Sequence, residues 1–383
     1  MKALGIVAEY NPFHNGHKYQ LEKAMEISGA DVSVAVMSGN FTQRGEAAIF
    51  SKWDRAGKAV EGGVNLVIEL PSLFAVSSAG TFARGGTKIL EGLKCSYISF
   101  GVEEEDHEKL LRLAEFIKRH RKSVEELIKR DTASGKSYPK RREEALNLLT
   151  GENLSEILSL PNNILALEYL SNMEYAEPLP VIRHMIEHNG KAIGNFASGS
   201  FIRSSMLDGE DISSLVPVSY DGLSFCDGSK LLGELQTVAM NSSTDFLNSI
   251  FGAEEGLGDI IKNRYRYWNT LNDAINDMKS KRYTETRITR VILSTVLGIR
   301  KSDVNSAKLY ARVLAFDSKG QEYLSYLKKQ EDVIPVITNI SRQNTDDVTD
   351  TLMFDIKASD LYNKISGKNL YENSDFVVMP SRF

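Results

Sequence analysis

Short apolar segments that alternate with helix-length polar segments constrain the fold of this 383-residue chain more than any other feature. Four of them are expected to be strands: residues 3–8, 32–37, 65–70 and 97–100. Each is largely apolar rather than strictly alternating, which is typical of parallel strands covered on both faces. Intervening stretches such as residues 52–61 have the length and polarity of surface helices. The pattern predicts a doubly wound parallel α/β sheet with a ligand crevice at the carboxyl ends of its strands.

Beyond residue 102 the chain has a different pattern. Residues 103–158 are charged and mostly helical, and residues 179–183 add a short strand. Three later segments have the periodicity of amphipathic helices: 260–271, 274–281 and 286–296. Two further segments have the composition of strands: 309–313 and 333–337. We therefore predict an α/β domain of residues 1–215 followed by a helix-rich domain of residues 216–383.

The composition excludes several classes of protein. Hydrophobic residues make up 42% and charged residues 25%, so the chain is neither disordered nor fibrous. Two cysteines, Cys95 and Cys226, cannot form a disulfide framework or a four-thiolate zinc site, which favours a reducing cytoplasmic location. No apolar run reaches the roughly 18 residues of a membrane span. The net charge of −5 argues against indiscriminate nucleic-acid binding, so we expect neither a membrane nor a DNA partner.

The strongest local motif is His14-Asn15-Gly16-His17, which follows the first expected strand and starts a helix. Backbone N–H groups and the helix dipole favour an anion there, and phosphate is the natural candidate. Both imidazoles can face a triphosphate and stabilise charge moving onto leaving pyrophosphate, while Gly16 allows close approach. The alternative is that the histidines cap a helix or bind zinc, although no third ligand such as cysteine is nearby.

A second motif, Ser198-Gly199-Ser200-Phe201-Ile202-Arg203, opens a later helix. Its small hydroxyl groups and one fixed cation suit the β- and γ-phosphates of a nucleotide. By itself the motif is also consistent with an ordinary helix N-cap.

Together, His14-x-Gly-His17 and Ser200-x-x-Arg203 resemble the paired signature of the nucleotidyltransferases related to class I aminoacyl-tRNA synthetases. Six segments are similar to the tRNA(Met) cytidine acetate ligase family: 8–18, 37–46, 52–53, 66–71, 99–101 and 161–165. The resemblance is dense over the first two hundred residues and thinner beyond them. It implies a Rossmann-like sheet of the nucleotidyltransferase type.

The resemblance also implies an activity. Members of that family use ATP to activate acetate as acetyl-adenylate. They then pass the acetyl group to N4 of the wobble cytidine of elongator tRNA(Met), which gives N4-acetylcytidine. Mg²⁺ is expected to bridge the phosphates. No protein ligand for a metal is assigned.

Site residues follow from the same resemblance. The catalytic residues would be His14, His17 and Arg203. The ATP-binding residues would be Val7, Ala8, Glu9, Tyr10, Asn11, Pro12, Phe13, His14, Asn15, Gly16, His17, Lys18, Tyr19, Gln20, Gly101, Asn162, Asn163, Arg183, Ser200 and Arg203. In one departure from the family pattern, Phe201 replaces a residue that would supply a second hydroxyl group to the phosphate grip.

Polar and charged residues after other expected strands suit a substrate crevice. Gln43, Arg44 and Lys52 follow strand ends and are assigned to a substrate or tRNA crevice. The alternative is that they are solvated polar side chains of surface loops. This alternative is stronger for Lys52 than for Gln43 and Arg44.

A basic segment lies between Lys262 and Lys301. It contains ten Lys or Arg residues and three acidic residues, in a chain whose net charge is −5. This asymmetry predicts contact with a phosphate backbone, and we assign tRNA binding to Arg264, Arg266, Lys281, Arg282, Arg287 and Arg290. Tyr265 and Trp268 could stack on splayed anticodon bases, or could belong to the apolar face of a helix.

Two other functions share parts of these patterns. A cofactor-type adenylyltransferase acting on a phosphorylated small molecule would use the same histidine motif without the basic segment. A non-catalytic RNA-binding protein would keep a degenerate nucleotide site. The residues alone distinguish neither acetate from another small carboxylate nor one oligomeric state from another.

Overall fold

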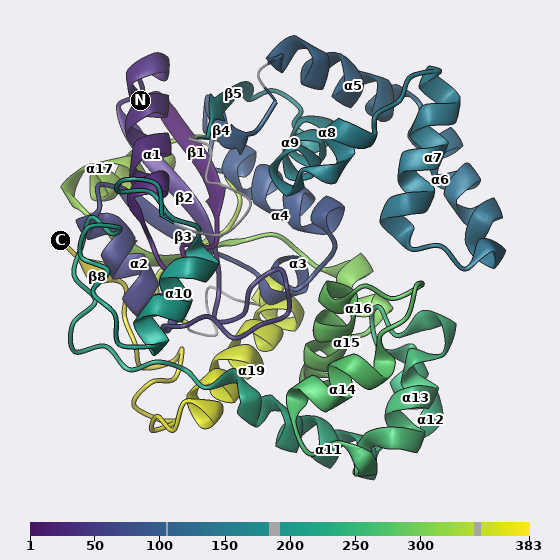
Figure 1. The fold of residues 1–383 in the computed structure, drawn as a ribbon. Helices are drawn as coiled ribbons and strands as arrows, with labels where there is room; N and C mark the ends of the chain where they lie inside the picture. The colour runs from purple at the N-terminus through teal and green to yellow at the C-terminus, as the bar shows by residue number, and fades with distance from the viewer. Residues whose placement is uncertain (105, 184–191, 341–345) are drawn as a thin grey trace.

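The computed structural model describes residues 1–383 apart from 105, 184–191 and 341–345. One sheet runs through it in the order β5-β4-β1-β2-β3-β6-β7, with β8 also paired to β6 (Figure 1). Its strands are β1 Ala3–Ala8, β2 Val32–Ser38, β3 Leu66–Leu70, β4 Tyr97–Val102, β5 Glu177–Ile182, β6 Ala311–Phe316, β7 Val336–Ile337 and β8 Ser381–Arg382. Strands β1 to β5 are parallel to one another, and β6 is antiparallel to β3. The predicted Rossmann-like parallel sheet is confirmed.

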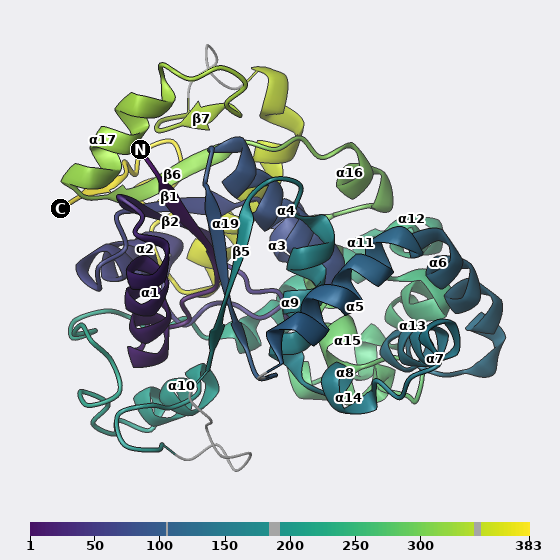
Figure 2. The ribbon, with the colours of Figure 1, turned by 90° about the horizontal axis from the view of Figure 1, so that it is seen from above.

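Helices cover both faces of the sheet (Figure 2). The sheet helices are α1 Asn15–Ser28, α2 Lys52–Glu61, α3 Ser72–Ala75, α4 Ala79–Gly92, α9 Pro161–Asn172 and α17 Ser318–Leu327. Alternate residues of β2 enter opposite cores: Val34 and Val36 pack with α4, α9 and α17, and Ala35 and Met37 pack with α1 and α2. This division explains why the strands are apolar on both faces.

A group of charged helices projects beyond α9. It consists of α5 His107–Arg119, α6 Arg121–Arg130, the 3₁₀ helix Asp131–Ser134, α7 Tyr138–Thr150 and α8 Ser155–Ser159. Their apolar stripes, including Leu110, Leu113 and Ile128, join the core beneath β4 and β5. Among the described residues no helix is long and apolar enough to cross a membrane.

A second helical group follows α10 Gly199–Leu207 and the 3₁₀ helix Gly228–Lys230. It consists of α11 Leu231–Asn241, α12 Thr244–Ser249, the 3₁₀ helix Glu254–Gly256, α13 Leu257–Arg264, the 3₁₀ helix Tyr265–Tyr267, α14 Leu271–Met278, α15 Glu285–Leu297 and α16 Lys301–Ser306. These helices share a core of their own, to which α19 Thr349–Ile365, preceded by the 3₁₀ helix Asp346–Val348, also contributes. The region is helix-rich, as predicted.

The prediction of one helix over residues 260–271 is wrong. Helix α13 ends at Arg264, and Trp268 is extended. Helix α14 then starts with its own capping box, in which Thr270 and Asp273 exchange side-chain and backbone hydrogen bonds. The box satisfies free N–H groups at a new helix start, so the chain turns instead of continuing.

The C-terminal segment returns to the first sheet. Strands β6, β7 and β8 extend the sheet beyond β3, so residues 1–215 do not complete it alone. The domain boundary at residue 215 therefore stays a prediction. Strands from both sides of that boundary belong to one eight-stranded sheet.

Candidate active site

The first turn of α1 holds two stacked imidazoles. His14 is the N-cap residue, and its Nδ1 accepts a hydrogen bond from the Gly16 N–H at 3.1 Å. The Nδ1 of His17 accepts from the His14 N–H at 3.3 Å, and the ring centroids are 3.7 Å apart. Both Nδ1 atoms therefore cap the start of α1, as the capping alternative expects. This capping leaves the proton of each neutral ring on Nε2, where it can be donated to a ligand.

Both imidazoles are neutral near pH 7. His14 is 4% exposed. Burial lowers its pKa to about 3, with smaller contributions from the positive charges of Arg183 and Arg203. Burial, His14 and Arg183 hold the pKa of His17 well below its usual range. Each neutral ring keeps one N–H group, on Nε2, and can donate one hydrogen bond to an anion.

The low pKa of His14 predicts a specific loss of stability in acid. The unfolded histidine takes up a proton near pH 6.5, whereas the folded one does so only near pH 3, so stability falls as the pH drops below 6.5. Between pH 7 and pH 5 the wild-type protein should lose about 2 kcal/mol more than His14→Gln. Urea unfolding at the two pH values measures this difference. The stability lost with the helix cap in His14→Gln is present at both pH values, so it cancels from the comparison. Equal losses for both proteins would contradict it.

The second predicted motif lies directly against the histidine loop, although the two are far apart in the sequence. Arg203 Nη1 donates to the backbone carbonyl of Asn11 at 2.8 Å. A Cβ placed on Gly199 would lie 3.3 Å from that carbonyl oxygen, so this position favours glycine. Ser198 caps α10, and the hydroxyls of Ser198 and Ser200 are 3.1 Å apart. The start of α10 thus lies against the histidine loop at the start of α1, and we call the site bordered by His14, His17, Ser200 and Arg203 the cradle. Figure 2 shows the two helices on the same side of the molecule.

Buried rings support the histidine pair from behind. Tyr10 and Phe13, at most 1% exposed, lie 4.9 and 5.8 Å from the ring of His17. The Asn11 side chain accepts from the Ile49 N–H at 2.9 Å. In the structure these three predicted ATP-binding residues shape the loop.

Other loop residues divide between supports and open positions. Asn15 Nδ2 donates to the carbonyls of Asn195 and Ser214 at 2.8 and 2.9 Å, and Gln20 Nε2 donates to Ser99 Oγ at 3.5 Å. The Tyr19 ring meets Phe196 edge-on, and Pro12 is buried. Val7 and Ala8 are the last two residues of β1. The side chain of Lys18 is 43% exposed and lies near Glu22, one turn further along the same helix.

A second wall follows β4, which is the neighbour of β1, and β5, which is the next strand beyond β4. It brings together Gly101, Asn162 and Arg183, three of the residues that the family resemblance assigns to ATP binding. Asn163 instead supports the backbone: it is fully buried, and its Oδ1 accepts from the Glu103 and Glu104 N–H groups at 3.0 and 3.2 Å. Sequence reasoning assigned no site role to Glu103, whose carboxylate accepts from Asn162 Nδ2.

On the opposite side, the loop after β2 meets Glu9. The Gln43 N–H donates to Glu9 Oε1 at 2.6 Å, and burial raises the pKa of Glu9. Gln43 and Arg44 therefore border the cradle from the side of β2.

The assignment of Lys52 to a substrate crevice is wrong. Lys52 is fully buried, and its Nζ lies 2.8 Å from both oxygens of Glu69 and 2.8 Å from Asp375 Oδ2. The Ser359 hydroxyl of α19 donates to the same Asp375 oxygen at 2.9 Å. Lys52 therefore ties α2 and β3 to the C-terminal segment. Because its partners are distant in the sequence, its local pattern could not show this.

Several predicted RNA contacts are engaged within the protein. Arg264 pairs with Asp277, and Arg287 Nη1 lies 3.1 Å from Glu255 Oε2. Arg282 Nε is 3.8 Å from the same carboxylate. These pairs reduce the positive charge offered to a ligand. Arg266 and Lys281 are exposed.

Arg290 holds the loop after β2. Its Nη1 donates to the Gln43 carbonyl at 3.3 Å, and the neighbouring Thr289 hydroxyl donates to the Arg44 carbonyl. Gly45, at φ +82°, packs so tightly that a Cβ there would lie 2.5 Å from the Arg290 nitrogen. Helix α15 thus braces one border of the cradle.

Two aromatic residues proposed to stack on bases belong to the core. Tyr265 and Trp268 are 5% and 3% exposed, and Trp268 Nε1 donates to Asp277 at 2.9 Å. The alternative that both are core residues is correct, although Tyr265 lies in a short 3₁₀ helix and Trp268 is extended. Tyr267, between them, is 73% exposed.

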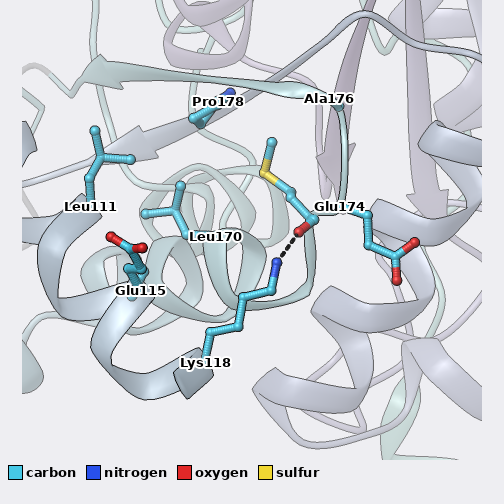
Figure 3. Close-up of a pocket in the computed structure, with 9 residues that line it drawn as sticks. Leu111, Glu115, Lys118, Leu170, Glu174, Ala176 and Pro178 are labelled. Atoms are coloured by element: carbon cyan, nitrogen blue, oxygen red, sulfur yellow. Dashed lines mark hydrogen bonds between the residues drawn. The ribbon is translucent and has the colours of Figure 1, made fainter. Parts of the chain in front are cut away.

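A shallow pocket of about 290 Å³ lies elsewhere, among α5, α9 and β5 (Figure 3). Leu111, Leu170 and Met173 give it an apolar floor, and Lys118 donates to the Met173 carbonyl at its rim. None of its lining residues belongs to the histidine loop or to α10, so the chemistry points to the cradle instead.

Comparisons with known proteins agree with this geometry. Residues 1–375 match the family described as HIGH Nucleotidyl Transferase. Proteins named tRNA(Met) cytidine acetate ligase from Thermoanaerobacter sp. strain X514 and Clostridium perfringens strain SM101 are each 35% identical, over 98% and 100% of both chains. Crystal structures of Thermotoga maritima TmcAL, apo and bound with alpha-thio ATP, have TM-scores of 0.88 and 0.87 at 29% identity, with both chains fully covered. The chain therefore belongs to the tRNA(Met) cytidine acetate ligase family and is a ligase.

Proposed function

We propose that this protein is a cytoplasmic, ATP-dependent acetate ligase that acetylates N4 of the wobble cytidine of elongator tRNA(Met). The observation that carries the proposal is the cradle in which the neutral His14–His17 pair meets Arg203 at the start of α10. Arg203 supplies a fixed positive charge, and the helix starts supply N–H groups, which suit a triphosphate. The alpha-thio ATP complex of Thermotoga maritima TmcAL supports ATP as the nucleotide.

The chemistry has two steps. An acetate oxygen attacks the α-phosphate of ATP, the bond to the β-phosphate breaks, and pyrophosphate leaves. His14, His17 and Arg203 stabilise the charge that moves onto the leaving group. The exocyclic amine of cytidine then attacks the acetyl carbon of acetyl-adenylate, AMP leaves, and the amine loses a proton. No protein nucleophile is required.

Mg²⁺ would be carried by the nucleotide. Across residues 1–383 outside the three gaps, no group of three or more His, Cys, Asp or Glu side chains is arranged to hold a metal ion. The described side chains therefore offer no metal site of three or more such ligands.

Exchange of labelled pyrophosphate into ATP tests the first step directly. Acetate-dependent exchange without tRNA is the expected result, and labelled acetate should then appear in tRNA(Met) as N4-acetylcytidine. Exchange only with a phosphorylated cofactor precursor would indicate a cofactor adenylyltransferase instead. ATP binding without any exchange would indicate a non-catalytic RNA-binding protein.

The exposed cations of the second helical group are proposed to bind the tRNA backbone. Arg266→Glu combined with Lys281→Glu should weaken tRNA binding about tenfold or more at 0.1 M salt and reduce its salt dependence. Lys319→Glu combined with Lys328→Glu, which changes the charge by the same amount at exposed positions of α17 and its C-cap, away from the second helical group, is the control (Figure 1). Filter binding at several salt concentrations measures both, and equal losses would show a nonspecific charge effect.

A further inference from the structure

Arg183 reaches its position by crossing the end of β4. A Cβ built on Gly101 would lie 2.9 Å from both Cγ and Cδ of Arg183, closer than real contacts allow. Glycine at this position therefore gives the aliphatic part of Arg183 room to pass. The role of Gly101 that the structure shows is to accommodate Arg183.

An asparagine then holds the guanidinium group. Arg183 Nη1 donates to Asn162 Oδ1 at 2.6 Å, and Asn162 Nδ2 donates to Glu103 Oε1. A side-chain amide has an acceptor end and a donor end. Because the Glu103 carboxylate only accepts, it turns the donor end of Asn162 toward itself and the acceptor end toward Arg183.

The backbone of Glu103 is fixed as well. The fully buried Asn163 accepts from the Glu103 N–H at 3.0 Å. The second carboxylate oxygen of Glu103, Oε2, is buried and has no hydrogen-bond partner among the residues described. Leaving such an oxygen unpaired is unfavourable, so folding stability does not explain a carboxylate here.

The guanidinium group lies within electrostatic reach of the cradle. Its positive charge contributes to the lowered pKa values of His14 and His17, and the negative charge of Glu103 acts in turn on Arg183. Strands β5, β4 and β1 are neighbours, which places Arg183, Glu103 and the histidine loop along one edge of the sheet.

We propose that Glu103 is a positioning residue for ATP binding: it orients Asn162, and Asn162 holds the Arg183 guanidinium group ready for the nucleotide. The proposal rests on the proposed function, because it takes ATP as the ligand of the cradle. A preorganised arginine binds an anion without losing further side-chain freedom. Glu103 therefore contributes to affinity without touching the ligand.

Glu103→Ala tests this relay through nucleotide affinity. We expect the Kd for ATP by calorimetry, and the KM for ATP in pyrophosphate exchange, to rise about tenfold, with kcat changed less than about twofold. Glu103→Gln keeps an oxygen that accepts from Asn162 and should recover most of the affinity. Glu104→Ala is the matched control on the adjacent residue, whose carboxylate instead accepts from the Asp106 N–H. The Kd and the KM do not depend on the fraction of folded protein.

A double mutant separates the relay from its alternatives. If Glu103 acts through Asn162, Glu103→Ala should have little further effect in the Asn162→Ala background. Multiplying effects would mean that Glu103 acts on the nucleotide by itself, and an unchanged Kd in Glu103→Ala would mean a structural role only; either result overturns the proposal. Calorimetry needs neither acetate nor tRNA, so ATP binding without acetate-dependent exchange would contradict the proposed function alone.

Discussion

Replacing His17 with alanine should reduce acetate-dependent pyrophosphate exchange by about 100-fold or more while leaving tRNA affinity near the wild-type value. Its neutral ring is placed to donate from Nε2 in the cradle, and its stacking on His14 at 3.7 Å helps to hold both rings. Loss of one preorganised donor to developing charge costs about 10²–10³ in rate. The measurement is the exchange rate at saturating ATP and acetate, beside filter binding of tRNA(Met).

The control for His17→Ala is His120→Ala. His120 is exposed at the end of α5, where it stacks on Phe116, and it should be dispensable for both properties. Arg266→Glu combined with Lys281→Glu should have the opposite effect to His17→Ala, with tRNA binding reduced and exchange retained. If both sets of variants lose both properties equally without unfolding, the division between cradle and basic surface is wrong.

Lys52→Met should lower the free energy of unfolding by about 3–5 kcal/mol. The substitution leaves the carboxylates of Glu69 and Asp375, both 2% exposed, without their shared cation. An uncompensated charge in a buried site is strongly unfavourable, whereas methionine fills the space of the lysine chain. Equilibrium urea unfolding at pH 7 measures the change.

Lys58→Met provides the matched comparison for Lys52→Met, because it removes the same group from the same helix. Lys58 pairs with Glu61 at 2.8 Å, but the two side chains are 21% and 37% exposed. A pair with that exposure contributes about 0–1 kcal/mol. Similar losses for the two variants would show that the buried cluster is not the main link to the C-terminal segment.

The strands and the histidine loop were predictable because their signals are local. The apolar segments that become β1 to β5 and the helix start at His14 depend on neighbours within a few residues. The pairing of His14 with Arg203 needed the resemblance to a family, because 189 residues separate them and no periodicity links them.

What the sequence could not decide has a common cause. Residues such as Lys52, Trp268 and Arg290 are of types that also occur at exposed binding surfaces, yet each is held by an element distant in sequence. A charge run does not show which of its members are paired, since the paired acids, Asp277 and Glu255, come from other turns and helices. The contact of Glu103 could not be predicted for the same reason, because its partner Asn162 lies 59 residues away.

The parallel sheet and the histidine loop at its carboxyl edge follow from the sequence alone. Apolar periodicity and free helix-start N–H groups are properties of adjacent residues, so they can be recognised without knowledge of the packing. The tertiary structure was needed to show that β6 to β8 complete the sheet, that Lys52 is buried among carboxylates and that Asn162 links Glu103 to Arg183. These features depend on which distant segments pack together, and burial then decides whether a charged side chain meets solvent, a ligand or a buried partner.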